Sequence, residues 1–176
     1  KSRASTTPFD TKSASATQKN TPSSVIPPIV GIGASAGGLE ALELFLKHVP
    51  ASSGIAFIVV QHLDPIHKSR VPEILQRVTA LNVVWAENLV KVIPDCVYVV
   101  PPNRFLSILH GVLYLHDLTK ELKKALSIDF FLRALAEDRG ESAVGVVFSG
   151  TGCDGTKGLQ AIKKGKGLTL AQEPAT

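Results

Sequence analysis

The stretch PIVGIGASAGGLEALELFLKHV, residues 28–49, joins a short apolar run to a stretch with helical periodicity through a glycine-rich turn. Residues 28–34 show no alternation of apolar and polar side chains, which is typical of a strand that is buried on both faces. Residues 37–49 place apolar side chains on one helical face and charged side chains on the opposite face. A buried strand that turns directly into an amphipathic helix indicates an α/β protein.

The same alternation of strand and helix continues along the chain. Further predicted strands are residues 55–61, 82–86, 96–102, 143–149 and 167–172, and further predicted helices are residues 69–79, 127–140 and 155–165. Ser127 is the expected N-cap of its helix and Gly140 its stop. Residues 105–116 are expected to form a hairpin that turns near His110 and Gly111. We therefore predict a three-layer, doubly wound α/β fold with a mostly parallel sheet, helices on both faces and a β-hairpin excursion.

Residues 1–24 differ in composition from the rest of the chain. They are rich in Ser, Thr, Lys and Pro and carry almost no large apolar side chains. Such a segment cannot bury enough surface to offset its ordering entropy, so we predict a disordered tail or linker at residues 1–24. One folded domain is expected at residues 25–176. Because the chain contains no Met and stops just beyond a predicted strand, we interpret it as a fragment with a C-terminal segment missing.

Charge and cysteine content narrow the possible functions. The formal net charge is +4, but the tail holds four basic residues and one acidic residue, which leaves the predicted domain near +1. A nucleic-acid partner is not expected, because the domain itself should carry a basic face for that role. Cys96 and Cys153 stand in no metal-binding spacing and are expected to be unpaired thiols. Without a signal peptide or a long apolar run, we predict a cytoplasmic protein with no direct membrane insertion.

Residues that suit acyl transfer follow the ends of the predicted strands. Ser35 follows the first buried strand, His62 follows the second, and Asp154 lies in the loop after the strand at residues 143–149. Ligands of such sheets bind beyond the carboxyl ends of the strands, so these side chains can meet. A serine hydroxyl needs a base to remove its proton, and the base needs an anion to fix its tautomer. The pattern therefore favours a Ser-His-Asp triad.

Other functions of these residues have to be weighed against the triad. Taken alone, Ser35 fits equally well as a small residue that caps the following helix. The glycine-rich turn only loosely imitates the G-x-G-x-x-G signature of dinucleotide binding, and the second strand ends in Gln61 and His62 instead of an acid that would hold a ribose. The segment HLDPIH matches no metal-ligand spacing, so neither a metal nor a cofactor is expected. The turn is interpreted as one that presents a nucleophile.

Five segments of the chain resemble the chemotaxis-receptor protein-glutamate methylesterase (CheB) catalytic domain. They are GIGASAGG, VVQHLDP, VYVVPPNR, SIDFFLRALAE and GVVFSGTGCDGTKGL, in that order. The resemblance implies hydrolysis of glutamate γ-methyl esters on chemoreceptors, with glutamine deamidation in some members. It also implies that the nucleophile is Ser35, the general base is His62 and the orienting carboxylate is Asp154. The implied oxyanion donors are the backbone N–H groups of Ala36 and Thr151.

The chain also departs from the pattern of this family. Ala36 stands where Thr is usual after the nucleophile, and Leu63 and Thr151 stand where Met is usual. Residues 1–24 cannot supply the receiver domain that usually precedes the esterase, which leaves the regulation open. The variant resembles esterase domains that are fused ahead of a receptor methyltransferase, so a covalently linked methyltransferase is an expected partner beside methylated chemoreceptor-type proteins. A non-catalytic docking or regulatory module remains the alternative.

Overall fold

The computed structural model describes residues 26–61, 70–119, 122, 126–148 and 153–173. The predicted tail at residues 1–24 therefore lies outside the described residues. The strands are β1 (Ile29–Ala34), β2 (Ala56–Gln61), β3 (Asn82–Trp85), β4 (Val90–Lys91), β5 (Cys96–Val99), β6 (Arg104–Leu109), β7 (Val112–Asp117), β8 (Ala143–Val147) and β9 (Leu168–Ala171). The helices are η1 (Ala36–Gly38), α1 (Leu39–Lys47), α2 (Val71–Gln76), α3 (Ser127–Arg139), η3 (Gly140–Ser142) and α4 (Thr156–Lys164).

The described residues form a six-stranded sheet with the strand order β3-β5-β2-β1-β8-β9. Every pairing in this sheet is parallel. The chain passes from β1 to β2 on one side and later returns to β8 on the other side, so the strand order reverses between β1 and β8. The sheet is therefore doubly wound, as the sequence predicts, and its switch point lies beside the strand that precedes Ser35.

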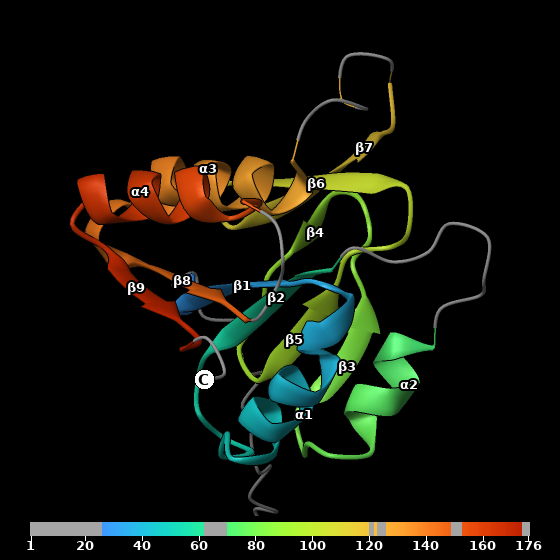
Figure 1. Ribbon diagram of the computed structural model, residues 1–176. Coiled ribbons are helices and arrows are strands. Elements are labelled where there is room, and N and C mark those ends of the chain that lie inside the picture. The colour runs from blue at the N-terminus through green and yellow to red at the C-terminus, as the bar shows by residue number, and fades with distance from the viewer. Residues whose placement is uncertain (1–25, 62–69, 120–121, 123–125, 149–152, 174–176) are drawn as a thin grey trace, which may run out of the picture.

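Two apolar clusters cover the two faces of the sheet, which makes the three-layer prediction correct (Figure 1). On one face, Ile29, Ile58 and other sheet residues pack against α3 and α4. On the other face, Val30, Phe57 and their neighbours pack against α1 and α2. Alternate residues of a strand point to opposite faces, so neighbouring residues such as Ile29 and Val30 belong to different clusters. Burial on both faces is the reason why these strands are apolar without alternation.

Glycines in the central strand bring α3 close to the sheet. A Cβ atom built on Gly33 would lie 2.3 Å from Cγ2 of Ile128, and one built on Gly31 would lie within 3 Å of Leu132 and Phe131. A larger residue at either position would require the facing side chains of α3, or the helix itself, to shift. The glycines on this side of the turn therefore serve packing, which accounts for a pattern that imitates a nucleotide-binding signature.

The predicted hairpin is present and belongs to a second, smaller sheet. The described residues pair β4, β7 and β6 in an antiparallel sheet, with His110 and Gly111 at the turn. Both turn residues have positive φ angles, 51° and 72°, as a tight hairpin turn requires. The carboxylate of Asp138 in α3 accepts hydrogen bonds from the backbone N–H groups of both. The hairpin is therefore fastened to α3 at its turn.

Several predicted boundaries need correction, among them those of the helix predicted at residues 69–79, which runs from Val71 to Gln76. Ser127 is the first residue of α3 and not its N-cap; Leu126 holds that position, with no capping hydrogen bond from its side chain. The strand predicted at residues 96–102 ends at Val99, since two prolines follow Val100 and cannot donate to a neighbouring strand. The strand predicted at residues 143–149 ends at Val147. Gly140 does end α3, with a φ of 54°.

Candidate active site

The candidate site lies at the carboxyl edge of the three central strands. β1 pairs with β2 and with β8, in parallel and in register up to Ala34, Gln61 and Val147. Ser35 is the residue after Ala34, and His62 is the residue after Gln61. Asp154 follows β8 after a short loop and comes just before α4. Three segments far apart in the sequence therefore converge at the switch point, where doubly wound proteins bind ligands.

Ser35 occupies the turn between β1 and the helical segment η1. Its backbone is extended, with φ −84° and ψ −179°, and its carbonyl oxygen accepts a hydrogen bond of 2.9 Å from the N–H of Gly38. The side chain stands at the N-cap position of η1 but makes no capping hydrogen bond to that helix. Ser35 is half-buried, and its side chain does not cap η1 as the capping interpretation would require.

Ala36 begins η1, which continues into α1. The first N–H groups of a helix have no partner within that helix and can bind an anion. The N–H of Ala36 follows Ser35 directly, so it has the position in the chain expected of an oxyanion donor. His62 and Thr151, the other two predicted site residues, lie outside the described residues, and their roles remain predictions.

Asp154 is held by the first turn of α3. One carboxylate oxygen, Oδ2, accepts a hydrogen bond of 3.1 Å from the N–H of Ile128, and the other, Oδ1, accepts one of 2.8 Å from the N–H of Asp129. These N–H groups are orphan donors of the helix, and the positive end of the helix dipole favours a negative charge there. The capping role that the sequence assigns to Ser127 thus belongs to a carboxylate from the loop that precedes α4.

The pattern of the sequence did not reveal the part played by Asp129. This side chain is only 6% exposed, although it lies in the first turn of a helix. Its Oδ1 accepts hydrogen bonds from the N–H of Gly155, at 3.0 Å, and of Gly158, at 2.8 Å. The available signal was an acid between two apolar residues at the start of a buried helix, but its partners lie 26 and 29 positions further along the chain.

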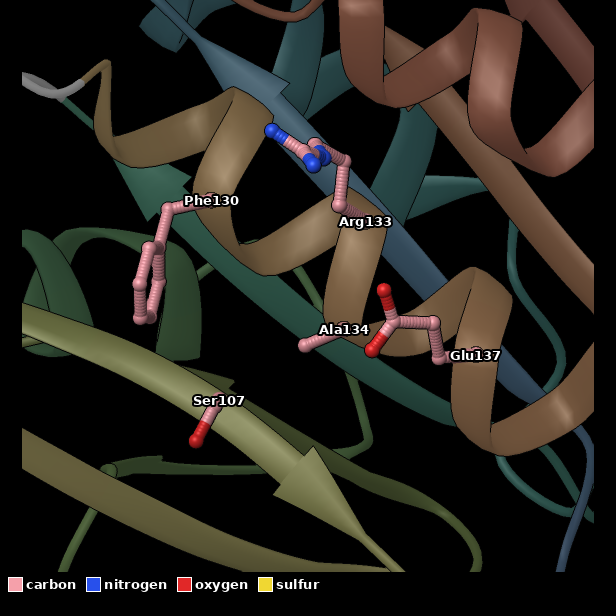
Figure 2. A pocket seen from close by; sticks show the side chains of 5 residues that line it. All are labelled: Ser107, Phe130, Arg133, Ala134 and Glu137. Carbon is pink, nitrogen blue, oxygen red and sulfur yellow. The ribbon is translucent and has the colours of Figure 1, made fainter.

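A second serine–histidine pair lies in the hairpin. Ser107 Oγ is 2.7 Å from Nε2 of His116, and the ring of His116 packs edge-on against Phe130 of α3. Ser107 and Phe130 also border a pocket of about 350 Å³ together with Arg133, Ala134 and Glu137 of α3. Figure 2 shows the four α3 residues on one side of this pocket and Ser107 of β6 on the other. His116 is half-buried.

Among the described residues, neither the two cysteines nor any metal-binding cluster adds a group to the candidate site. Cys96 is buried, and burial raises the pKa of its thiol, whereas Cys153 is exposed; neither forms a disulfide. The described residues hold no cluster of His, Cys, Asp and Glu that could bind a metal ion. None of the helices described is long and apolar enough to span a membrane.

Fold and site together define a doubly wound α/β protein with polar side chains gathered at the switch point. A structural match to the Thermotoga maritima CheB methylesterase catalytic domain has a TM-score of 0.76 and 29% identity, and covers 86% of this chain and 82% of that one. The protein-glutamate methylesterase/protein-glutamine glutaminase of Photorhabdus laumondii is 32% identical over 152 residues, and that of Yersinia pestis is 33% identical. Both alignments cover 84% of this chain and 43% of the relative.

The family model described as CheB methylesterase matches residues 30–176. The chain therefore belongs to the CheB methylesterase family. It spans less than half the length of the curated relatives that it matches.

Proposed function

We propose that this chain is the catalytic domain of a protein-glutamate methylesterase that uses Ser35, His62 and Asp154 as a triad. The observation that carries the proposal is the turn at Ser35. There a serine stands at the switch point of the sheet, directly before the first N–H groups of a helix. The membership of the family and the names of its relatives support the same activity.

The reaction proceeds in two halves. The Oγ of Ser35 attacks the carbonyl carbon of a glutamate γ-methyl ester while His62 takes its proton, and the backbone N–H groups of Ala36 and Thr151 stabilise the negative oxygen that develops. The bond to the methoxy group then breaks, and His62 returns the proton to the departing methanol. Water, deprotonated by His62, attacks the acyl-enzyme and releases the glutamate carboxylate and Ser35.

Asp154 supports both halves by fixing the tautomer of His62 and stabilising its charged form. Its carboxylate is already oriented by two N–H groups of α3, so little reorganisation is needed when charge develops. A γ-amide in place of the ester would pass through the same steps with ammonia as the leaving group. Glutamine deamidation is therefore part of the proposal, as the names of the relatives suggest.

The proposed partners are methylated chemoreceptor-type proteins in a cytoplasmic setting, with a covalently fused methyltransferase domain as a further candidate. The motifs GASAGG and SGTG carry the likeness to the fused form. A non-catalytic docking module is the competing proposal. It predicts receptor binding without turnover.

The deciding experiment measures methanol release from membranes that contain methylated receptors. The chain should release methanol, and Ser35→Ala should lower kcat by about 10⁴-fold or more, because the nucleophile is removed. A Ser35→Ala variant within tenfold of the wild type would contradict the triad. Receptor binding with no release of methanol by the wild-type chain would favour the docking module.

A further inference from the structure

Asp129 and Asp154 cap each other's helices. Asp154 accepts hydrogen bonds from the N–H groups of Ile128 and Asp129 at the start of α3. Asp129 in turn accepts hydrogen bonds from the N–H groups of Gly155 and Gly158 at the start of α4. Four hydrogen bonds thus join the first turns of two helices, and one of the two carboxylates belongs to the proposed triad.

The hydrogen bond from Gly155 acts on the backbone that carries Asp154. The N–H of Gly155 belongs to the peptide group that directly follows Asp154, so its bond to Oδ1 of Asp129 fixes the orientation of that peptide group. Gly155 has a φ of 98°, a conformation that only glycine adopts readily and that it can also leave readily. A contact from another segment is therefore needed to hold the backbone conformation of this glycine.

The first turns of α3 and α4 are closely packed around Gly155 and Gly158. A Cβ atom on Gly158 would lie 2.5 Å from Cβ of Leu132, and one on Gly155 would lie 2.8 Å from Cγ2 of Val147. Helices α3 and α4 therefore touch where the carboxylates exchange hydrogen bonds. Because Asp129 projects from α3, it ties the backbone at Asp154 to the helix that also binds the Asp154 carboxylate.

We propose that Asp129 is a positioning residue that sets the geometry of the Asp154 carboxylate through the Gly155 peptide group. This inference rests on the proposed triad. A small misplacement of a catalytic group lowers the rate of the chemical step with little effect on substrate binding. Asp129 touches neither the proposed nucleophile nor the base in the hydrogen bonds described, so its effect has to pass through Asp154.

The position of an oxygen atom, and not the charge of Asp129, is what the geometry requires. Its other oxygen, Oδ2, is buried and has no hydrogen-bond partner among the residues that the structure describes. An asparagine could keep Oδ1 on the two glycine N–H groups, since Asn and Asp are equally good at helix N-termini. A glutamate would keep the charge but move the oxygens by one methylene group. These two variants therefore separate position from charge.

The test compares Asp129→Ala, Asp129→Asn and Asp129→Glu in methanol release and in the rate at which a fluorophosphonate labels Ser35. We expect Asp129→Ala to lower kcat by roughly 10- to 100-fold with KM within about twofold of the wild type. Asp129→Asn should retain kcat within about threefold, and Asp129→Glu should lose activity as Asp129→Ala does. An active glutamate variant beside an inactive asparagine variant would overturn the proposal, and this pair decides the matter if Asp129→Ala does not fold.

Asp138 provides a matched control. It lies at the other end of α3, and its carboxylate also accepts two backbone N–H groups, those of His110 and Gly111. Asp138→Ala should lower the stability of the protein as Asp129→Ala does, but leave kcat and the labelling rate unchanged. If Asp138→Ala lowered kcat as strongly as Asp129→Ala, a general loosening of α3 would explain both results and positioning would be excluded.

A double-mutant cycle tests whether Asp129 acts through Asp154. In the background of Asp154→Ala, a further Asp129→Ala change should leave the labelling rate of Ser35 within about twofold, because the group that Asp129 positions is gone. Full additivity would overturn the proposal. The wild-type chain could release no methanol and yet be labelled faster than Asp129→Ala. That result would uphold the positioning role of Asp129 and contradict the proposed substrate. Normal methanol release by Asp129→Ala would reject positioning alone.

Discussion

Two serines of this chain stand beside the features expected of a nucleophile, and they differ in what surrounds them. Ser107 has a histidine nitrogen 2.7 Å from its hydroxyl oxygen and borders a pocket. Ser35 lies at the switch point of the sheet, directly before a helix N-terminus, at the edge where β1 and β8 both end.

A serine–histidine hydrogen bond alone does not make a hydrolytic site. In the hairpin, the described residues provide no carboxylate hydrogen-bonded to the other nitrogen of His116, and the neighbouring Asp117 pairs with Arg104 instead. Ser107 lies within β6, in the middle of a strand and not in a turn before a helix. Catalysis needs an oriented base and donors for the developing charge, which the loops at the edge of a parallel sheet can supply.

The largest effect is expected at Asp154, the carboxylate proposed for the Ser35 site. Asp154→Asn should lower kcat on the order of 10⁴-fold, because an amide favours the wrong tautomer of His62. The variant also replaces one acceptor for the N–H groups of α3 by a donor, so the free energy of unfolding should fall by about 1–3 kcal/mol. Steady-state kinetics and urea unfolding measure the two effects separately.

Asp138→Asn is the matched control for this change, since Asp138 also binds two backbone N–H groups and lies far along α3 from the site. It should reduce stability without reducing kcat. Comparable losses of kcat in both variants would mean that Asp154 only stabilises the helix. Ser35, like Ser107, would then have no carboxylate that orients its base.

The next effect concerns the oxyanion donor proposed at Thr151. Thr151→Pro removes the backbone N–H, and the loss of one such donor typically lowers kcat by about 10²–10³-fold. Thr151→Met changes only the side chain and should stay within a few-fold of the wild type. Circular dichroism of both variants checks the fold, and near-normal kcat in a well-folded proline variant would exclude this N–H from the oxyanion hole.

The order of elements and the layers of the fold were predictable because each rests on a local pattern. Buried strands such as β2 and amphipathic helices such as α1 have periodicities that can be read within one segment. The ends of the elements were harder to predict. The N–H of Val100 still donates a hydrogen bond to the carbonyl oxygen of Val59 although β5 ends at Val99, and the two-residue β4 is too short to leave a pattern. Local periodicity contains no information about where neighbouring segments stop pairing.

The site could be predicted only as far as the loops that converge on it. Ser35 and Asp154 follow strands whose carboxyl ends meet, so topology brings them to one edge. The capping of α3 by Asp154 and of α4 by Asp129 depends on contacts between segments about 25 residues apart, and nothing local distinguishes Asp129 from an ordinary helix-start acid. The local sequence predicts that Ser127 caps α3, but in the tertiary structure the carboxylate of Asp154 caps it.

The smallest effect should come from the hairpin serine. Ser107→Ala removes the hydroxyl partner of a half-buried imidazole nitrogen, so the free energy of unfolding should fall by about 1 kcal/mol in urea unfolding. Methanol release should be unchanged, because the described residues give the pair no orienting carboxylate. Mass spectrometry after treatment with a fluorophosphonate should find the label on the peptide with Ser35 and not on the peptide with Ser107. A labelled Ser107, or a tenfold loss of kcat in a folded Ser107→Ala variant, would show that the hairpin pair takes part in the chemistry and that the contrast between the two serines is mistaken.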